Sequence, residues 1–134
     1  MAQFPTADWA QVFMEKLNRD EQYAQIAHKW EGDILFVIQP EGGLNEPVRL
    51  YFDLWHGKCR DAFAPGDQEA PTPSFVLQAP YGNFKKILTG ELHPMQALMT
   101  RKLSLQGNMA TLMRNVPTVL DFVRCAREIT DDFV

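Results

Sequence analysis

"GELHPMQALMTRKLSLQGNM", residues 90–109, is the most informative stretch of this 134-residue chain. It begins with a glycine, which suits the left-handed C-terminus of a helix. Pro94 stands where a second helix can begin, because the first helical position needs no N–H group. Residues 102–106, "KLSLQ", then alternate polar and apolar side chains, as a half-buried strand does. The stretch predicts a short helix followed by a strand, with Leu103 and Leu105 on the apolar side of that strand.

Upstream of this stretch, the apolar pattern changes from helical to extended. Apolar residues recur at helical spacing over residues 7–20, where Thr6 suits the N-cap position, and again over residues 20–30. Short runs rich in β-branched and aromatic residues then predict three strands of an antiparallel meander, at residues 34–38, 48–55 and 58–65. The third run has the weakest pattern, and alternation puts three residues on one of its faces: Cys59, Asp61 and Phe63.

A proline-rich surface loop is predicted at residues 65–73 and a strand at residues 74–79. Three further helices are predicted at residues 81–90, 109–115 and 118–129. Asn83 is a candidate N-cap for the first of these helices. A break is expected near Asn115–Val116, because the residue before a proline avoids the helical region. The element order predicts an α+β fold, a mostly antiparallel sheet covered by helices, in one domain spanning residues 1–134.

Charge and cysteine content argue against several classes of partner. Thirteen basic and seventeen acidic residues give a net charge of −4, and no basic run exceeds two residues. Nucleic acid and anionic membranes attract clustered positive charge, so we expect neither as the main partner and at most transient membrane contact. Two distant cysteines, Cys59 and Cys125, form no disulfide framework, and no secretory segment follows Met1. We therefore expect a cytoplasmic protein.

Catalytic and metal-binding signatures are missing from the sequence. The three histidines, His28, His56 and His93, lack metal-ligand spacing to one another and to the cysteines. No nucleophile elbow or phosphate loop is present. We therefore expect no catalytic residues, no metal site and no cofactor.

Apolar residues and methionine are concentrated between residues 75 and 113, which hold four of the six methionines. Aromatic and aliphatic residues at helix and strand spacing usually form a core. Methionine is flexible and polarizable, however, and it suits an adaptable apolar binding site. The pattern is compatible with both interpretations.

Residues 74–114 resemble the lipid-binding domain of the type-2 sterol carrier proteins. The matching positions form the family's Gly-x-Leu-x-Pro, Ala-Leu-Met, Lys-Leu-x-Leu-x-Gly and Asn-Met pattern, at Gly90, Leu92, Pro94, Ala97, Leu98, Met99, Lys102, Leu103, Leu105, Gly107, Asn108 and Met109. The C-terminus carries no peroxisomal tripeptide. The resemblance thus points to a standalone prokaryotic relative. One position departs from the pattern: the family usually has glycine before the Lys-Leu pair, and Arg101 here predicts a different local backbone.

The resemblance implies a five-stranded sheet backed by helices, with a hydrophobic tunnel between them and no covalent chemistry. It implies ligands such as fatty acids, acyl-CoA, sterols or phospholipids. Carried over by position, the tunnel-lining residues would be Phe75, Leu77, Phe84, Leu88, Leu98, Leu103, Leu105, Met109 and Met113, with Phe36 and Phe52 added from the sheet.

An empty tunnel has an energetic cost. A dry cavity of roughly 300 Å³ would cost about 7 kcal/mol, against a typical net stability of about 5–15 kcal/mol. We therefore expect the ligand-free protein to close the tunnel partly with Met and Phe side chains, or to hold water or lipid.

A second hypothesis keeps the same fold but closes the tunnel. The protein would then be an interaction or dimerisation module, as a homodimer or beside a partner enzyme. Exposed tryptophans, Trp9, Trp30 or Trp55, would favour it, because aromatic anchors dominate interface energies.

Overall fold

The computed structural model describes residues 2–65 and 72–134, and its centre is a five-stranded sheet. The strands are β2 (Ile34–Gln39), β3 (Val48–Trp55), β4 (Lys58–Phe63), β5 (Phe75–Pro80) and β6 (Ser104–Gln106). Their spatial order is β4-β3-β2-β5-β6; β2 and β5 are parallel, and every other neighbouring pair is antiparallel. The predicted α+β fold with a mostly antiparallel five-stranded sheet is confirmed. Of the proline-rich loop predicted at 65–73, residues 66–71 lie outside the described part of the chain.

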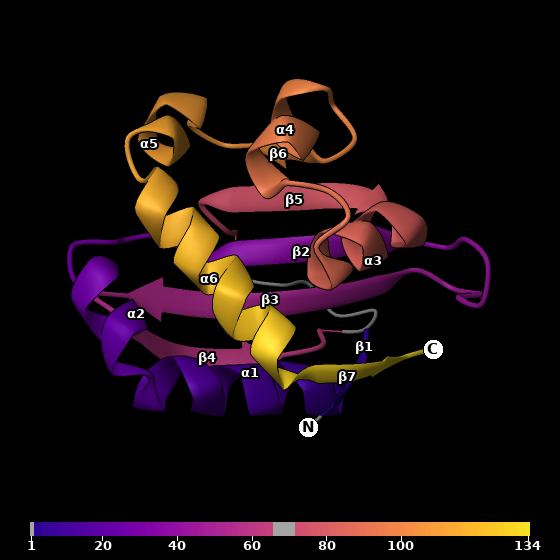
Figure 1. Ribbon diagram of the computed structural model, residues 1–134, viewed down its shortest axis with the longest axis horizontal. Coiled ribbons are helices and arrows are strands. Elements are labelled where there is room, and N and C mark those ends of the chain that lie inside the picture. The colour runs from indigo at the N-terminus through magenta and orange to yellow at the C-terminus, as the bar shows by residue number, and fades with distance from the viewer. Residues whose placement is uncertain (1, 66–71) are drawn as a thin grey trace.

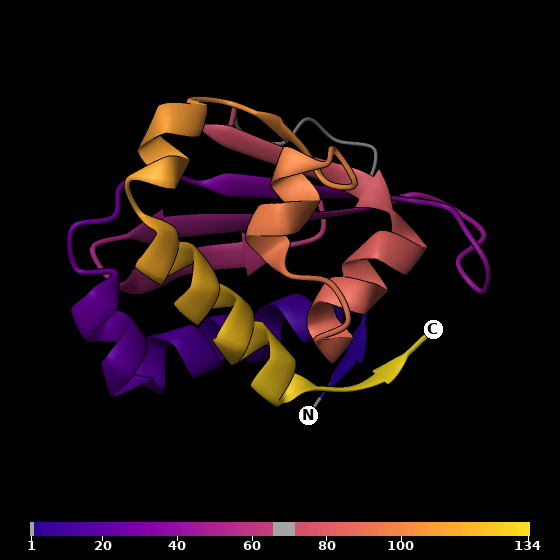
Figure 2. The ribbon, with the colours of Figure 1, turned by 45° about the horizontal axis from the view of Figure 1, so that its top comes forward.

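The helices gather on one side of this sheet. They are α1 (Ala7–Arg19), α2 (Glu21–Ile26), α3 (Tyr81–Thr89), α4 (Pro94–Met99), α5 (Met109–Met113) and α6 (Val116–Ile129). In Figure 1, α6 crosses in front of the sheet, α1 runs along its β4 edge, and α4 and α5 lie at the β5–β6 end. Figure 2 shows the same helical layer after the top of the molecule has been turned toward the viewer. Within the described residues, no helix has the length and apolar character needed to cross a bilayer.

Strand register aligns the apolar side chains that face the helices. Phe36 on β2 lies opposite Leu50 on β3 and Leu77 on β5, and Leu77 lies opposite Leu105 on β6. Residues opposite one another in neighbouring strands point to the same face of a sheet. One continuous apolar row therefore crosses four strands beneath the helices.

The face assignment predicted for the third strand is wrong. An irregularity between Asp53 and Leu54 makes Cys59 pair with Leu54 while Asp61 still pairs with Asp53, so Arg60 is an extra residue. A bulge of this kind shifts the alternation by one. Cys59 and Ala62 are both buried, whereas Asp61 is exposed.

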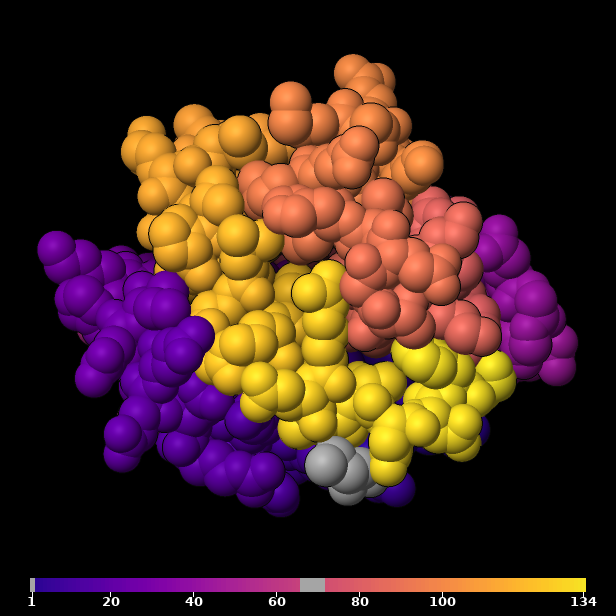
Figure 3. Space-filling view, viewed as in Figure 1, coloured from indigo at the N-terminus to yellow at the C-terminus, as the bar shows by residue number. Residues whose placement is uncertain are grey.

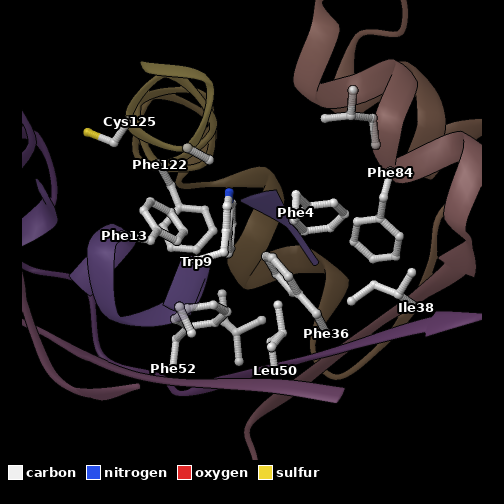
Figure 4. Close-up of a cluster of buried hydrophobic side chains, with 14 of the residues drawn as sticks. Phe4, Trp9, Phe13, Phe36, Ile38, Leu50, Phe52, Phe84, Phe122 and Cys125 are labelled. Carbon is white, nitrogen blue, oxygen red and sulfur yellow. The ribbon is translucent and has the colours of Figure 1, made fainter. Parts of the chain in front are cut away.

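A second, two-stranded sheet was not predicted from the sequence. Strand β1 (Ala2–Phe4) pairs in parallel with β7 (Thr130–Phe133), and the Val134 N–H donates to the Phe4 carbonyl at 3.1 Å. Phe4 is thereby completely buried, with its ring centroid 4.8 Å from that of Trp9 (Figure 4). This pairing joins the two ends of the described chain beside the helical layer.

Most helix boundaries agree with the predicted capping residues. Thr6 accepts a hydrogen bond from the Trp9 N–H at 3.0 Å, and Gly90 ends α3 with a φ of 86°. The break before α6 falls at Asn115, as predicted. Asn83 is not a cap, because α3 already begins at Tyr81; its side chain donates to the Lys102 carbonyl instead.

Two further differences concern helix length and glycine geometry. The helix predicted over residues 20–30 ends at Ile26.

Arg101, where the resembled family has glycine, has a φ of 62°, in the left-handed region that favours glycine. The turn is held by bonds from the Arg101 N–H to the Leu98 carbonyl and from the Leu103 N–H to the Ala97 carbonyl. Arg101 therefore adopts a backbone conformation that suits the glycine of the resembled family.

Candidate functional site

A cavity of about 80 Å³ lies between the helices and the five-stranded sheet. Seven of the eleven residues predicted to line a tunnel form part of its wall: Phe36, Phe75, Leu77, Phe84, Leu88, Leu98 and Leu103. They come from two neighbouring strands, from α3 and α4, and from the segment before β6. Local patterns and the resemblance were therefore enough to locate the β5, α3 and α4 side of the cavity.

The structure places the other four predicted residues outside the wall. Phe52 is completely buried, but its ring packs among other aromatic rings, 5.4 Å from Phe13. Leu105 is half-buried on the edge strand β6. Met109 and Met113 are 41% and 46% exposed, because they lie one turn apart on the outer side of α5, whose single buried residue is Leu112.

Sequence reasoning missed the rest of the wall, most of which comes from the N-terminal and C-terminal parts of the chain. These residues are Phe4, Trp9, Tyr23, Trp30, Ile34, Leu54, Ile87, Pro94, Leu112, Thr118, Val119, Phe122, Val123 and Ala126. Those on α6 include positions 119, 122, 123 and 126, which have the i, i+3, i+4, i+7 spacing of one helix face. That periodicity could have identified the α6 wall. Nothing local distinguishes Phe4 or Trp9 from ordinary core residues.

The wall is almost wholly apolar. Among the described residues, two side-chain hydroxyls belong to the wall, those of Tyr23 and Thr118. The Thr118 hydroxyl donates to the Ile26 carbonyl at 3.3 Å. Among the described residues, no charged side chain belongs to the wall. Such a surface suits hydrocarbon.

Aromatic rings fill much of the space between sheet and helices. The Phe36 ring lies 5.5 Å from Phe84, and the Phe13 ring lies 4.8 Å from Phe122 (Figure 4). The remaining 80 Å³ is well below the roughly 300 Å³ at the low end for ligand pockets, and an empty cavity of this size costs about 2 kcal/mol. Phenylalanine and tryptophan thus account for the closure, whereas Met109 and Met113 lie outside it.

The wall is incompletely shielded where α3 faces α6. Leu88, Val119 and Val123 line the cavity and are only half-buried. Figure 3 views this side of the molecule, where α6 lies between α3 and α2. This side of the wall is therefore partly exposed to solvent.

The cluster of titratable groups outside the cavity is a salt-bridge network. Asp20, Asp121 and Cys125 bring possible metal-ligand atoms within 4.8 Å of one another. Arg124 already contacts both carboxylates at 2.7 Å, and Lys16 contacts Asp20 at 3.0 Å. The hydrogen bond from Arg124 holds the pKa of Asp20 well below its usual range. Protein cations therefore balance these acids, and the network joins α1 and α2 to α6.

Both cysteines are buried free thiols. Burial raises the pKa of Cys59 and that of Cys125 to about 12. A thiol with this pKa is scarcely ionised at neutral pH and is a poor nucleophile. Neither cysteine has the surroundings of a catalytic residue.

A second, open hollow of about 470 Å³ lies beside the N-terminus of β2 and the end of β3. Its polar groups bond to one another: the Tyr51 hydroxyl donates to Asp33 at 2.7 Å, and Arg60 pairs with Asp53 at 3.0 Å. Trp55 at its margin is 39% exposed and packs beneath Arg60, 4.8 Å from its guanidinium carbon. The other two tryptophans are buried.

Comparison with solved structures gives two close matches. A crystal structure of sterol carrier protein 2 is 35% identical, with a TM-score of 0.86 over 96% of this chain and 100% of that one. A Thermus thermophilus protein described as a candidate sterol carrier protein is also 35% identical, with a TM-score of 0.84 over 94% of this chain and 89% of that one. The apo form of sterol carrier protein 2 from Yarrowia lipolytica shares the fold, with 18% identity and a TM-score of 0.62 over 95% of each chain.

A search of curated proteins found no significant match. A sequence model of the SCP-2 sterol transfer family, in contrast, matches residues 5–119. This range contains most of the cavity wall, from Trp9 to Val119. Family and fold together point to lipid binding or transfer in general, and the chain belongs to the SCP-2 sterol transfer family.

Proposed function

We propose that the protein binds and transfers apolar, lipid-like ligands in the cavity between sheet and helices, without covalent chemistry. The observation that carries this proposal is the apolar wall, in which Leu88, Val119 and Val123 are only half-buried; we infer that the opening for the ligand lies at these three residues. The ligand classes are fatty acids, acyl-CoA, sterol-like molecules and phospholipids. Residues 1–134 act as one domain, and the hydrocarbon contacts the seven predicted wall residues named above.

Binding requires the cavity to expand from about 80 Å³. Rotation of aromatic rings and outward movement of α3 or α6 at the half-buried opening would provide the volume. A sixteen-carbon chain would gain about 12 kcal/mol gross at about 0.8 kcal/mol per CH₂, against about 4–15 kcal/mol lost on association. The balance favours moderate affinity, which suits a carrier that must also release its ligand.

The test is titration with a fluorescent fatty acid, together with native mass spectrometry of the purified protein. Val123→Phe places a ring at the opening and should weaken binding by about tenfold or more. Val12→Phe is the matched control, because Val12 is a half-buried valine of α1 outside the cavity wall. Its affinity should stay within about twofold of the wild type. Absence of micromolar binding and of co-purified lipid in the wild type would refute the proposal.

The alternative is an interaction or dimerisation module with a closed cavity. Burial of Trp9 and Trp30 removes two of the three aromatic anchors that would have favoured it, and Trp55 is already covered in part by Arg60. Light scattering that shows a tight dimer, combined with no ligand uptake, would favour the alternative. We also propose a reducing, cytoplasmic location, which the two buried free thiols support.

A further inference from the structure

Charge is distributed unevenly along the chain. Residues 81–116, which include α3, α4, β6 and α5, hold five basic side chains and one acid, Glu91, for a net charge of +4. The rest of the chain has eight basic and sixteen acidic residues, for a net charge of −8. The overall value of −4 therefore conceals a positively charged segment, and its part from α4 to α5 lies at the β5–β6 end of the molecule in Figures 1 and 2.

Exposed apolar side chains lie beside the cavity in the same region. Three helices each carry a cavity-lining residue followed directly by an exposed apolar one: Leu98–Met99, Leu112–Met113 and Val119–Leu120. Met99 is 75% exposed, the highest value among the large apolar residues described. Consecutive residues of a helix point about 100° apart, so each exposed side chain flanks the wall. We call Met99, Met113 and Leu120 the apolar rim.

Basic side chains follow the two methionines of this rim. Arg101 and Lys102 come two and three residues after Met99, and Arg114 comes directly after Met113. All three basic residues are exposed. No carboxylate in the described part of the chain forms an ion pair with any of them. Their charge is therefore available to an external partner.

We propose that the apolar rim and these three basic residues dock the protein on an anionic lipid surface. The alternating pattern fits a membrane interface, where long basic side chains reach headgroups while neighbouring apolar side chains enter the acyl boundary. Positive charge alone would also attract an acidic protein, but the acyl boundary of a membrane in addition accepts Met99, which is 75% exposed. Docking here sets the α4–α6 side of the cavity against the bilayer. The biological purpose of this docking rests on the proposed lipid-carrier function, whereas binding to vesicles can be measured independently of that function.

The expected affinity follows from the charges. Each Lys or Arg near an anionic leaflet increases the binding of a protein to the membrane roughly fivefold, and salt weakens this effect. The rest of the chain carries a net charge of −8, which an anionic surface repels, and this repulsion limits binding to a transient contact. Net charge alone, which argued against a membrane as main partner, does not reveal this arrangement.

The experiment is co-sedimentation of the whole protein with vesicles of phosphatidylcholine, with and without one-third phosphatidylglycerol. The wild type should bind only the anionic vesicles, and binding should fall between low salt and about 0.15 M salt. The variant R101Q/K102Q/R114Q should bind at least about tenfold more weakly. The variant M99Q/M113Q should lose about fivefold, because glutamine has a similar size but does not enter the acyl boundary.

The matched control is R19Q/K29Q/K58Q, which removes three exposed basic residues from elsewhere on the molecule. It changes the net charge equally, yet its binding should stay within about threefold of the wild type. Equal losses in the two triple variants, or no wild-type binding at low salt, would overturn the proposal. Equally strong binding to soluble polyglutamate, insensitive to M99Q/M113Q, would overturn it in favour of an acidic protein partner.

Fatty-acid titration without vesicles separates this inference from the proposed function. All three variants should keep wild-type affinity for the fluorescent fatty acid, because none of the substituted residues belongs to the cavity wall. Vesicle binding with neither fatty-acid uptake nor co-purified lipid would refute the carrier function and leave the docking surface. Fatty-acid uptake without vesicle binding would refute the docking surface and leave the carrier function.

Discussion

Asp20 and Arg124 lie 104 residues apart in the sequence and are joined by a 2.7 Å hydrogen bond between the carboxylate Oδ1 and the guanidinium Nη2. Asp20 also caps α2, because its side chain accepts from the Tyr23 N–H. One carboxylate therefore begins α2 and fastens the α1–α2 junction to α6. Since α6 supplies part of the cavity wall, this contact helps to position it.

Substitutions at Asp20 should separate these two roles. Asp20→Asn keeps the capping oxygen and removes the charge, and it should lower the free energy of unfolding by about 1–3 kcal/mol. Asp20→Ala also removes the cap and should cost about 1 kcal/mol more. Urea unfolding at pH 7 measures both values. Equal stability of the two variants would show that the cap contributes nothing.

Acid should weaken the same contact. The pKa of Asp20 is lower in the folded protein than in the unfolded chain, where it lies near about 3.9, so folding favours its ionised form. The resulting stability is present above about pH 4 and is lost as the pH falls below that value toward the folded pKa. The free energy of unfolding should therefore fall more steeply below about pH 4 in the wild type than in Asp20→Asn. Parallel curves would contradict this assignment.

Arg101 should be a site of backbone strain. Its φ of 62° is unfavourable for a residue with a Cβ atom, whereas glycine adopts it freely. Arg101→Gly should raise the free energy of unfolding by about 0.5–1 kcal/mol, because strain relief exceeds the added entropy of the unfolded chain. Arg101→Ala keeps the Cβ atom and should change stability by less than about 0.5 kcal/mol. Thermal unfolding of the two variants makes the comparison.

The thiols should be protected in the native protein. With a pKa raised to about 12, Cys125 is roughly a thousandfold less ionised at pH 8 than an ordinary thiol, and burial blocks the reagent as well. A chromogenic disulfide reagent should label neither cysteine until urea unfolds the chain. Rapid labelling of the folded protein, traced to one residue with Cys125→Ser or Cys59→Ser, would contradict the buried positions.

Leucine truncations should distinguish cavity from core. Leu98 lines the cavity and Leu17 does not, although both are buried. Leu98→Ala and Leu17→Ala should each lower the free energy of unfolding by about 2–5 kcal/mol. Only Leu98→Ala should change the affinity for a fluorescent fatty acid, because it alters the volume available to the ligand. A similar change in Leu17→Ala would place the binding site elsewhere.

Local sequence patterns predicted the elements whose stability is itself local. Thr6 and Gly90 act at helix ends through their own side chain or backbone, and both were identified. Strands β1 and β7 were missed because they are short and partly polar, and each depends on a partner more than 120 residues away. The β4 bulge was missed for a similar reason: the extra residue is visible only when β3 is placed beside it.

The candidate site was predictable where the family pattern was strongest. Phe84 and Leu98 belong to segments that matched in spacing and residue type, and both line the cavity. Met109 was assigned to the wall from the same pattern, but the inner side of α5 is occupied by Leu112. Phe4 reaches the cavity through the β1–β7 pairing, which no local signal indicates.

The position of α6 has a consequence for synthesis of the protein. Phe122 packs against Phe13, Phe36 and Phe52, yet α6 follows every strand of the five-stranded sheet along the chain. At about 5–20 residues per second, the ribosome needs roughly 1–5 s to proceed from the end of β6 to the end of α6. During that interval the nascent chain presents an uncovered aromatic surface, which a chaperone would recognise and a premature stop codon would leave permanently exposed.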